Sequence, residues 1–363
     1  MQRRWPARLL TPVVEAGRRT RPPVRVVVTG AAGFIGAKVA SELLDRGHEV
    51  VAIDNFDDTY PIEFKTARTD RLSKRDGFRL VTGDIRVEAD VEEVFSSHPD
   101  AVVHLAAQGG LRKSMDDPAA FISANVSGFG MVIKAAADAG VGNFVYASSG
   151  AVYGGSPSLP FAEGDAAAWP LSLYGATKRC DELLAFTYAH GVGLRCTGLR
   201  FSTVYGTDGR PDMAMYNFTR RIQRGEPIKV HGHGRMVRDF VYGDDVAHVV
   251  ALAAEDESTF SCTPVAGGPS DRVAAAPWRV LNCATGRQVQ LLEMIKLVEA
   301  AVGRPAELEL IDALVAEVPE NGMDVHELER TLGFVPQVAV EEGIPAAVEW
   351  YLEYLERASA PAN

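Results

Sequence analysis

The sequence predicts an α/β fold, with a doubly wound parallel sheet covered by helices on both faces and a smaller C-terminal α/β lobe. Three observations predict it. Apolar, valine-rich runs alternate with helix-spaced segments between residues 24 and 201. A glycine-rich turn, TGAAGFIG from Thr29 to Gly36, joins the first of these runs to the first helical segment. Beyond Tyr205 the alternation loosens into shorter pieces, which indicates the second lobe.

The first half of the chain supplies most of the expected sheet. Short runs of β-branched and aromatic residues predict strands at residues 24–28, 49–53, 78–82, 101–105, 143–147 and 194–201. Apolar residues at helical spacing predict helices at 37–46, 91–96, 116–139 and 171–190, and the polar segment 57–75 is compatible with another. Because helices separate successive strands, the strands are expected to run parallel.

The second half contains shorter pieces of the same two kinds. Strands are expected at residues 228–231 and 279–282, and helices at 213–224, 244–254, 291–302, 325–332 and 341–357. The segment 255–277 is rich in Ser, Gly, Pro and Ala and is expected to be a surface loop. We therefore expect residues 24–201 to form mainly a dinucleotide-binding domain. Residues 202–363 are expected to form mainly a substrate-binding lobe, interleaved with returns to the main sheet.

Composition excludes several classes of partner. The chain has 363 residues, 47% of them hydrophobic and 23% charged, which suits a soluble globular protein with a full core. Its formal net charge of −11 repels nucleic acids and acidic membrane surfaces, so neither is an expected partner. No run approaches the roughly 18 apolar residues that a membrane span needs.

The termini and the cysteines indicate the cellular compartment. Residues 1–23 contain six arginines and one glutamate but no apolar signal-peptide core, so a disordered basic extension is expected there. The four cysteines are widely spaced and form no Cys-x-x-Cys pair. Reduced thiols and a cytoplasmic location are therefore expected.

The glycine turn is expected to bind the diphosphate of a dinucleotide. A buried strand, a tight turn and a helix N-terminus in that order direct backbone N–H groups and the positive end of the helix dipole at one point. The second strand ends in Asp54-Asn55, about 20 residues further on, where an acid meets the adenosine ribose of such a ligand. Asp84 and Ile85 follow the third strand, and Ala106, Ala107 and Gln108 follow the fourth.

A second group of residues carries chemistry. Tyr174 and Lys178 are one turn apart on the same face of a helix, so that an ammonium can stabilise a phenolate beside it. Such a phenolate can take a proton from a hydroxyl whose carbon gives up a hydride. Ser149 follows a strand directed at the same edge of the sheet and can hydrogen-bond the same substrate oxygen.

Together these motifs resemble the extended short-chain dehydrogenase/reductases, and within them the nucleotide-sugar 4-epimerases, above all those that act on UDP-glucuronate. The resemblance covers about residues 24–357. Besides TGAAGFIG and the Tyr174–Lys178 pair, its motifs are HLAAQGGLRKS (104–114), SLYGATK (172–178), GLRFSTVYG (198–206), GRPDMA (209–214) and RDFVYGDD (238–245).

The resemblance implies a Rossmann-type fold and a tightly held NAD that takes a hydride from C4 of a UDP-sugar and returns it to the opposite face. Tyr174 is then the base, Lys178 holds the nicotinamide ribose, and Ser149 orients the 4-oxygen. The expected cofactor-binding residues are Gly30, Gly33, Phe34, Ile35, Gly36, Asp54, Asn55, Asp84, Ile85, Leu105, Ala106, Ala107, Gln108, Asn125, Ser148, Tyr174, Lys178 and Phe201.

The chemistry of a uronic acid requires additional cationic groups. Its 4-keto form is a β-keto acid that can lose CO2, so an epimerase must hold the carboxylate by hydrogen bonds. Arg210 matches a family position near this carboxylate, although it could instead pair with Asp212, and Arg200 could pair with Asp208. The expected substrate-binding residues are Arg112, Ser149, Tyr174, Thr203, Arg210, Met215 and Arg238, with Arg112 directed at the carboxylate or the diphosphate and Arg238 at the diphosphate.

Alternatives remain open at this point. UDP-glucose 4-epimerases and UDP-glucuronate decarboxylases share the scaffold, and a non-catalytic NAD-sensing protein is possible on it. Gly150-Ala151 lacks the carboxylates that dehydratases and decarboxylases of the family place after the equivalent serine, and both Tyr174 and Lys178 are present. Leu314-Val315-Ala316-Glu317 departs from the family pattern, so the resemblance implies that a familiar contact to the diphosphate or uridine is missing or altered.

Metal binding and assembly complete the expectations. His231 and His233 lie in VHGHGRM, but two ligands without a third do not make a metal site, so no metal is expected. The resemblance implies a homodimer through the helices at 116–139 and 171–190.

Overall fold

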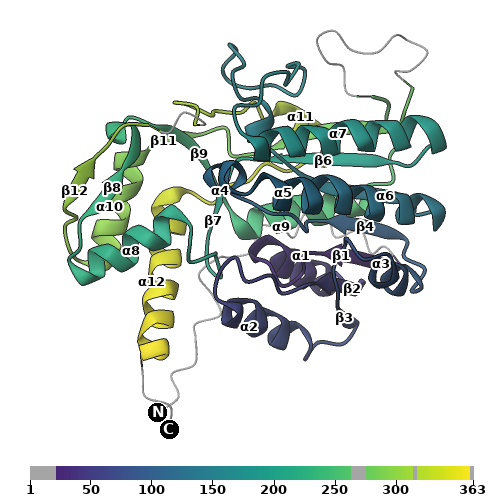
Figure 1. Ribbon diagram of the computed structural model, residues 1–363, viewed down its shortest axis with the longest axis horizontal. Helices are drawn as coiled ribbons and strands as arrows, with labels where there is room; N and C mark the ends of the chain where they lie inside the picture. The colour runs from purple at the N-terminus through teal and green to yellow at the C-terminus, as the bar shows by residue number, and fades with distance from the viewer. Residues whose placement is uncertain (1–21, 263–274, 314–316, 360–363) are drawn as a thin grey trace.

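The computed structural model describes residues 22–262, 275–313 and 317–359, and a seven-stranded parallel sheet lies at its centre (Figure 1). The strand order is β10-β6-β5-β4-β1-β2-β3. The bounds are β1 Arg25–Thr29, β2 Glu49–Asp54, β3 Phe78–Thr82, β4 Ala101–His104, β5 Asn143–Ser149, β6 Cys196–Phe201 and β10 Trp278–Cys283.

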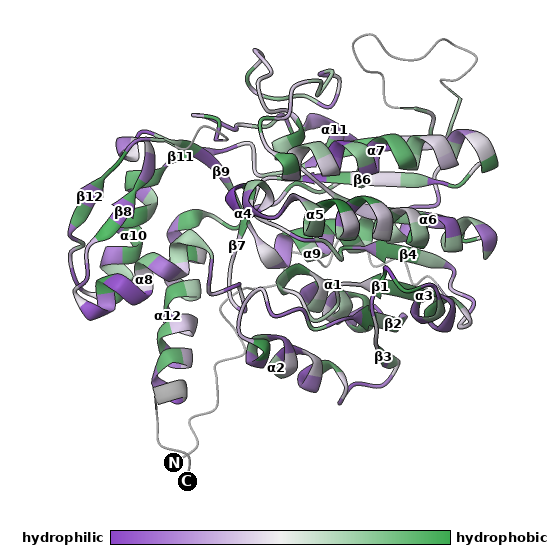
Figure 2. Ribbon diagram, viewed as in Figure 1, coloured by the Kyte–Doolittle hydropathy of each residue, from purple (hydrophilic) through white to green (hydrophobic). Residues whose placement is uncertain are grey.

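Helices cover both faces of this sheet. Successive side chains of a strand point to opposite faces, and in most of these strands the side chains on both faces are apolar, so both faces must be buried. Val26 and Val28 of β1 pack with α1 (Phe34–Asp45) and α9 (Gly243–Glu255), whereas Val27 packs on the other side with α3 (Glu88–Phe95), α6 (Phe129–Asp138) and α7 (Leu173–Val192). In Figure 2 the ribbon of β4 is green, as expected for a strand buried on both faces. The doubly wound α/β class predicted from the sequence is thus confirmed.

The single long helix expected at 116–139 is wrong in detail. The chain forms α4 (Leu111–Asp116), α5 (Pro118–Phe121), a π-helical segment η1 (Ile122–Gly128) and then α6. Pro118 lacks an N–H and disfavours a helical Asp117, whose backbone leaves the helical region at φ −131° and ψ 73°. The helical stretch Pro118–Asp138 is long and apolar enough to span a membrane by length and composition alone, but it packs against α7 and α3.

Chain segments from the second half form a separate lobe at the left of Figure 1. Helices α8 (Ala214–Arg224), α10 (Leu291–Val302) and α12 (Val340–Ser359) pack together beside the two-stranded sheet of β8 (Ile228–Val230) and β12 (Leu308–Leu310). Their apolar side chains form a third core cluster, which includes Ile222, Ile295 and Val348.

A further small sheet connects the lobe to the main sheet. A three-stranded sheet contains β7 (Thr203–Tyr205), β9 (Val237–Tyr242) and β11 (Gln288–Gln290), and sequence periodicity did not predict any of these short strands. Helices α2 (Ile62–Leu72) and α11 (His326–Leu332), and the 3-10 turns η2 (Gly150–Val152) and η3 (His231–Gly234), complete the described elements. Residues 1–21 of the expected basic extension, 263–274 of the expected loop, and 314–316 of the segment that departs from the family pattern lie outside the described residues.

The sheet order locates the site. Strand β1 pairs with β2 on one side and with β4 on the other. The first three strands therefore extend the sheet in one direction from β1, and the later strands extend it in the opposite direction. In open α/β sheets the crevice at the carboxyl end of such a switch point binds the ligand.

Candidate active site

A cleft of about 1230 Å³, open solvent included, lies at the carboxyl ends of β1, β2, β4 and β5. Of the predicted cofactor residues, all except Asn125 line it, and Arg210 lines it from the second lobe. The lining also includes residues that the sequence did not single out: Ile53, Asp57, Thr59, Tyr60, Lys65, Gly83, Arg86, Gly109, Ala124 and Ala147.

The glycine turn brings backbone close to backbone. Gly30 has φ +73°, and a Cβ placed on it would lie 2.8 Å from the backbone N and Cα of Ala106. The N–H groups of Leu105 and Ala106 donate to Thr29 Oγ1 at 3.2 and 3.1 Å, which ties the loop after β4 to the turn. Only glycine fits this close approach. The turn and the N-terminus of α1 line the cleft, and backbone N–H groups at a helix N-terminus are suited to bind a diphosphate.

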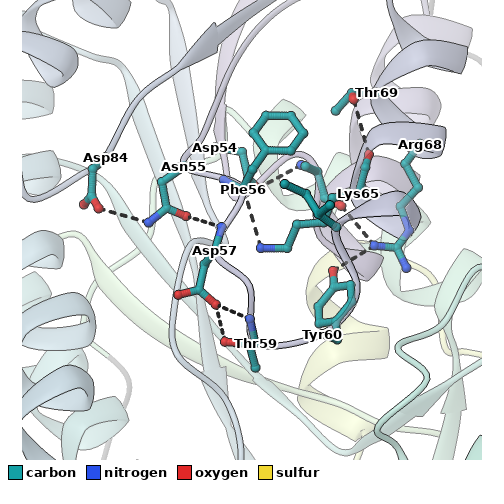
Figure 3. A network of polar contacts seen from close by, with 12 residues as sticks. Asp54, Asn55, Phe56, Asp57, Thr59, Tyr60, Lys65, Arg68, Thr69 and Asp84 are labelled. Carbon is teal, nitrogen blue, oxygen red and sulfur yellow. Dashed lines mark hydrogen bonds and ion pairs between the residues drawn. The ribbon is translucent and has the colours of Figure 1, made fainter.

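Asp54 lies at the end of β2 where a ribose-binding acid is expected. One carboxylate oxygen accepts from the N–H of Ala32 in the glycine turn, and the other from the N–H of Phe56, both at 2.9 Å. Lys65 Nζ lies 3.9 Å from Asp54 Oδ1 (Figure 3). Each carboxylate oxygen can accept more than one hydrogen bond, so Asp54 keeps the capacity to accept from ribose hydroxyls.

Asn55 and Asp84 continue this edge of the cleft. The amide of Asn55 donates to Asp84 Oδ2 at 2.9 Å, and Arg86 donates to both oxygens of Asp84. The hydrogen bonds from Arg86, the largest influence, hold the pKa of Asp84 well below its usual range. Asp84 is therefore a hydrogen-bond acceptor at all physiological pH values.

Tyr174 and Lys178 both line the cleft from α7. The ring of Phe121 meets the Tyr174 ring edge-on, with 6.4 Å between centroids. Lys178 is 1% exposed, and its ammonium pairs with Asp181 Oδ2 at 3.1 Å. Burial raises the pKa of Asp181 to about 7, although the charge of Lys178 and its hydrogen bond act in the opposite direction.

His104 is the buried last residue of β4. Its Nδ1 is 2.9 Å from Thr29 Oγ1, and its Nε2 has no hydrogen-bond partner among the described residues. Burial, together with the charge of Lys178, lowers the pKa of His104 to about 3. His104 is therefore neutral and supports the strand end, as a core residue does.

Ser149 ends β5, and its Oγ accepts from the N–H of Ala151 at 3.2 Å. The neighbouring Ser148 lines the cleft but donates to the buried Glu182 at 2.6 Å. Glu182 in turn accepts from Arg200 Nε and NH2 at 2.8 and 2.9 Å, so Arg200 pairs with Glu182 rather than with Asp208, the alternative that the sequence left open. Burial acts to raise the pKa of Glu182, but the charge and hydrogen bonds of Arg200 outweigh it and lower the pKa.

Arg210 reaches the cleft from the loop after β7. Its Nε and NH2 donate to Asp212 at 3.0 and 2.7 Å, and its guanidinium lies 5.4 Å from the centroid of the Tyr60 ring. A Cβ placed on Gly109 would lie 3.2 Å from Arg210 NH1, so this nitrogen is directed at the loop after β4. Burial alone would lower the pKa of Arg210, but the hydrogen bonds and charge of Asp212 raise it.

Ser149 and the remaining predicted site residues do not line the cleft. Asn125, buried in the π-helical η1, exchanges hydrogen bonds with the backbone of Gln108 at 2.8 and 3.1 Å and so holds a cleft residue in place. Arg112 is exposed on α4, and Thr203 is half-buried at the start of β7. Met215 belongs to the apolar core of the second lobe. Their roles stay predictions.

Arg238 lies on β9 and also stays a prediction as a diphosphate ligand. Its NH1 donates to the carbonyls of Val237 and Pro319 at 2.8 and 3.1 Å. Burial lowers its pKa, and the charge of Glu317 acts in the opposite direction. Glu317 is the one residue of the segment 314–317 that the structure describes.

The histidines of η3 lie away from the cleft. His233 Nε2 is 2.9 Å from Asp312 Oδ1, and His231 Nδ1 is 3.3 Å from the backbone carbonyl of Asp312. Over residues 22–262, 275–313 and 317–359, no group of three or more His, Cys, Asp or Glu side chains converges on a metal position.

The fold and the cleft define a class of protein: a dinucleotide-dependent enzyme with a tyrosine–lysine pair at the end of a glycine-rich crevice. The model of the NAD dependent epimerase/dehydratase family matches residues 26–261. The chain belongs to this family, whose cofactor is NAD. The glycine turn at Gly30, where only glycine fits beside Ala106, suits the diphosphate of that cofactor.

Individual relatives agree with this assignment. A probable UDP-glucuronate 4-epimerase of Rhizobium meliloti is 38% identical over 92% of this chain and 99% of its own length. The structure of a UDP-glucuronic acid 4-epimerase from Bacillus cereus, in complex with UDP-glucuronic acid and NAD, has a TM-score of 0.81 and 27% identity, covering 91% of this chain and 99% of that one. A UDP-glucose 4-epimerase of Thermotoga maritima, solved with UDP-glucose, has a TM-score of 0.78 and 29% identity over 91% and 99% of the two chains.

Proposed function

We propose that this protein is an NAD-dependent epimerase that inverts C4 of a UDP-uronic acid, interconverting UDP-glucuronate and UDP-galacturonate through a 4-keto intermediate. The observation that carries the proposal is the presence of Arg210 in the same cleft as Tyr174 and Lys178. A guanidinium there offers a bidentate partner to a sugar carboxylate beside the reacting hydroxyl. The relatives that act on UDP-glucuronate support the same substrate.

The cofactor would lie along Gly30, Asp54 and Ala106, and when bound it supplies the chemistry of accepting a hydride and giving it back. Tyr174 would take the proton of the 4-hydroxyl and return it to the 4-oxygen. Lys178 would hold the nicotinamide ribose and keep positive charge beside Tyr174. Ser149 would donate to the 4-oxygen and fix its orientation.

The carboxylate must be held while the sugar is a β-keto acid. Arg210 would hold it, and the fixed orientation of its guanidinium, set by Asp212 and the Tyr60 ring, supports that role. Thr203, which starts β7 shortly before Arg210 in the sequence, would add a second hydrogen bond. Arg112 and Arg238 would contact the nucleotide end of the substrate.

The two residues directly after Ser149, Gly150 and Ala151, carry no acid or base. A Cβ placed on Gly150 would collide with the terminal methyl group of Met323, which is 2% exposed. The position that a carboxylate occupies in dehydratases and decarboxylases is thus next to a buried thioether. This argues for epimerisation rather than elimination or loss of CO2.

A second candidate is epimerisation of neutral UDP-glucose, which the likeness to the Thermotoga maritima enzyme favours. The two candidates differ in what Arg210 would bind. A neutral sugar presents a hydroxymethyl group at C5, which gives a guanidinium no charge to pair with, so a partly buried Arg210 supports the uronate.

Assembly, domain division and location are also proposed. Met115 of α4, Ile122 of η1 and Leu183 of α7 are large apolar residues that are 61%, 48% and 52% exposed. These elements pack against one another, and a homodimer through them would bury such side chains. We infer a cytoplasmic enzyme with residues 24–201 mainly for NAD and 202–363 mainly for substrate.

The test is incubation of the purified protein with UDP-glucuronate, with the products followed by NMR. A mixture with UDP-galacturonate is expected. Release of CO2 with formation of a UDP-pentose, or conversion of UDP-glucose alone, would contradict the proposal.

A further inference from the structure

Arg68 of α2 is a buried arginine that joins three separate segments of the chain. It is 1% exposed, although arginine is rarely buried in full. Its NH1 donates to the carbonyl of Ala32 at 3.0 Å and to the hydroxyl of Tyr60 at 2.8 Å. Its NH2 donates to the carbonyls of Asp208 and Gly209 at 2.6 and 3.3 Å.

These partners come from the two halves of the active site. Ala32 belongs to the glycine turn, and its own N–H donates to Asp54. Asp208 and Gly209 immediately precede Arg210 in the loop after β7. One guanidinium therefore connects the cofactor turn to the loop that carries the proposed carboxylate ligand.

Tyr60 makes the same connection through its ring. Its hydroxyl accepts from Arg68 in Figure 3, and the guanidinium of Arg210 lies 5.4 Å from its ring centroid. Lys65 Nζ lies 5.3 Å from the same centroid. Cations at this range of an aromatic ring are attracted by its quadrupole, so Tyr60 holds the Arg210 side chain, while Arg68 holds the backbone of the two residues before Arg210.

The charge at Arg68 is not neutralised locally. No carboxylate of the described residues forms an ion pair with it, and its partners are carbonyls and a phenol. Burial lowers the pKa of Lys65, with Arg210 and Arg68 acting in the same direction against Asp54 and Asp57. Three cations thus surround one ring, and an anionic ligand in the cleft would reduce their mutual repulsion.

We propose that Arg68, together with Tyr60, is a positioning residue for carboxylate recognition: it holds the Asp208–Gly209 backbone against the glycine turn so that Arg210 faces the sugar. The inference rests on the proposed function. It goes further in assigning part of the discrimination between uronate and neutral sugar to Arg68, a residue that does not line the cleft. Arg68 lies too deep to be a ligand itself, and it does not line the cleft.

The experiment measures binding of UDP-glucuronate and UDP-glucose by calorimetry to the full-length, NAD-loaded protein. A Tyr174→Phe background prevents turnover. Arg68→Met is expected to weaken UDP-glucuronate binding by about tenfold or more, the equivalent of one charge-assisted hydrogen bond, while UDP-glucose binding changes by less than about twofold. A merely structural role would weaken both ligands in parallel, and that result would overturn the proposal.

Smaller changes keep the test valid if Arg68→Met does not fold. Arg68→Lys keeps the charge but loses the two separate guanidinium nitrogens that donate to Ala32 and to Asp208. Tyr60→Phe removes only the hydroxyl that accepts from Arg68. Tyr60→Leu removes the ring as well. It should therefore reduce the preference for UDP-glucuronate over UDP-glucose more than Tyr60→Phe does. Unchanged preference for UDP-glucuronate in these three variants would also overturn the proposal.

Arg71→Met is the matched control. Arg71 lies one turn further along α2 and pairs with the carboxylate of the same Asp208 at 2.7 Å, but its side chain is 57% exposed. Its removal should leave both affinities unchanged, because exposed ion pairs contribute little. Arg210→Gln separates the two hypotheses: if it has no effect on UDP-glucuronate binding, the proposed function of Arg210 fails, whereas an effect of Arg210→Gln without one of Arg68 rejects this inference alone.

Discussion

Arg210 and Asp212 form a two-bonded ion pair at the cleft, with Nε–Oδ1 and NH2–Oδ2 distances of 3.0 and 2.7 Å. The pair uses one edge of the guanidinium and leaves NH1 directed at Gly109. The sequence left open whether Arg210 pairs with Asp212 or serves the substrate, and this geometry makes the two roles compatible. Asp212 orients the group that would meet the carboxylate.

Arg210→Lys should therefore impair substrate binding more than the chemical step. A lysine cannot reproduce the fork with Asp212 and the stack on Tyr60 at the same time. We expect KM for UDP-glucuronate to rise by roughly tenfold to a hundredfold, with kcat changed far less, in steady-state assays. Arg330→Lys, at a 73% exposed arginine on α11, is the control. An unchanged KM would remove Arg210 from the carboxylate site.

Tyr174→Phe should abolish turnover while the protein keeps its NAD. The phenol oxygen is the proposed proton acceptor, and loss of a general base costs about 10²- to 10⁴-fold in rate. Activity and the NAD content of the purified protein would be measured together. Tyr188→Phe, on the same helix but outside the cleft, should behave as the unmodified protein does. Wild-type activity in Tyr174→Phe would contradict the assigned base.

Gly30→Ala should weaken retention of NAD and destabilise the fold. The added Cβ would lie 2.8 Å from the backbone of Ala106, at a φ of +73° that costs a non-glycine residue about 1–3 kcal/mol. Thermal melting and cofactor content would show this. Gly130→Ala is a matched control, because a Cβ there meets nothing within 4 Å on helix α6, and it should stabilise by about 0.5–1 kcal/mol. Equal effects of the two changes would refute the explanation.

Asp181→Asn should alter the pH dependence of stability. Burial raises the pKa of Asp181 to about 7 in the folded protein, against an ordinary aspartate pKa of 3.8. Between these two values the unfolded chain binds fewer protons at this group, so the wild type loses stability as pH rises through this range and the loss is complete above about pH 7.

The asparagine variant lacks this titration, so its melting temperature relative to wild type should increase from about pH 4 to pH 7 and then level off. Melting temperatures recorded across pH 4–9 would check this. Asp138→Asn, at a side chain that is 64% exposed, should show no such trend. A pH-independent difference for Asp181→Asn would mean that the carboxyl titrates normally.

Most of the sheet could be predicted from the sequence because both of its faces are buried. Strands such as β1 and β4 are continuous apolar runs, and the helices between them have clear periodicity. The strands β7 and β11 could not be predicted, since three residues carry too little pattern, and β9 (VRDFVY) was missed because Arg238 and Asp239 interrupt its apolar run. The break at Asp117–Pro118 could have been found, because proline restricts the residue before it.

The site divides in the same way. Gly30, Asp54, Tyr174 and Lys178 belong to local motifs, and each lies on an element that ends at one edge of the sheet. The contributions of Tyr60, Lys65 and Arg68 depend on contacts with segments far away in the chain. One indication of these three residues was present in the sequence: they belong to the polar segment 57–75, which follows Asp54 at the end of β2.

By itself the sequence determined the strand–turn–helix cradle, the tyrosine–lysine pair on one helical face and the family, because each depends on neighbouring residues and short-range periodicity. The tertiary structure alone decided what the distant charged groups face: Arg200 pairs with Glu182, and Arg68 links the glycine turn to the Arg210 loop. Burial and long-range packing select these partners, since a charge removed from water must find a partner wherever the fold brings one near.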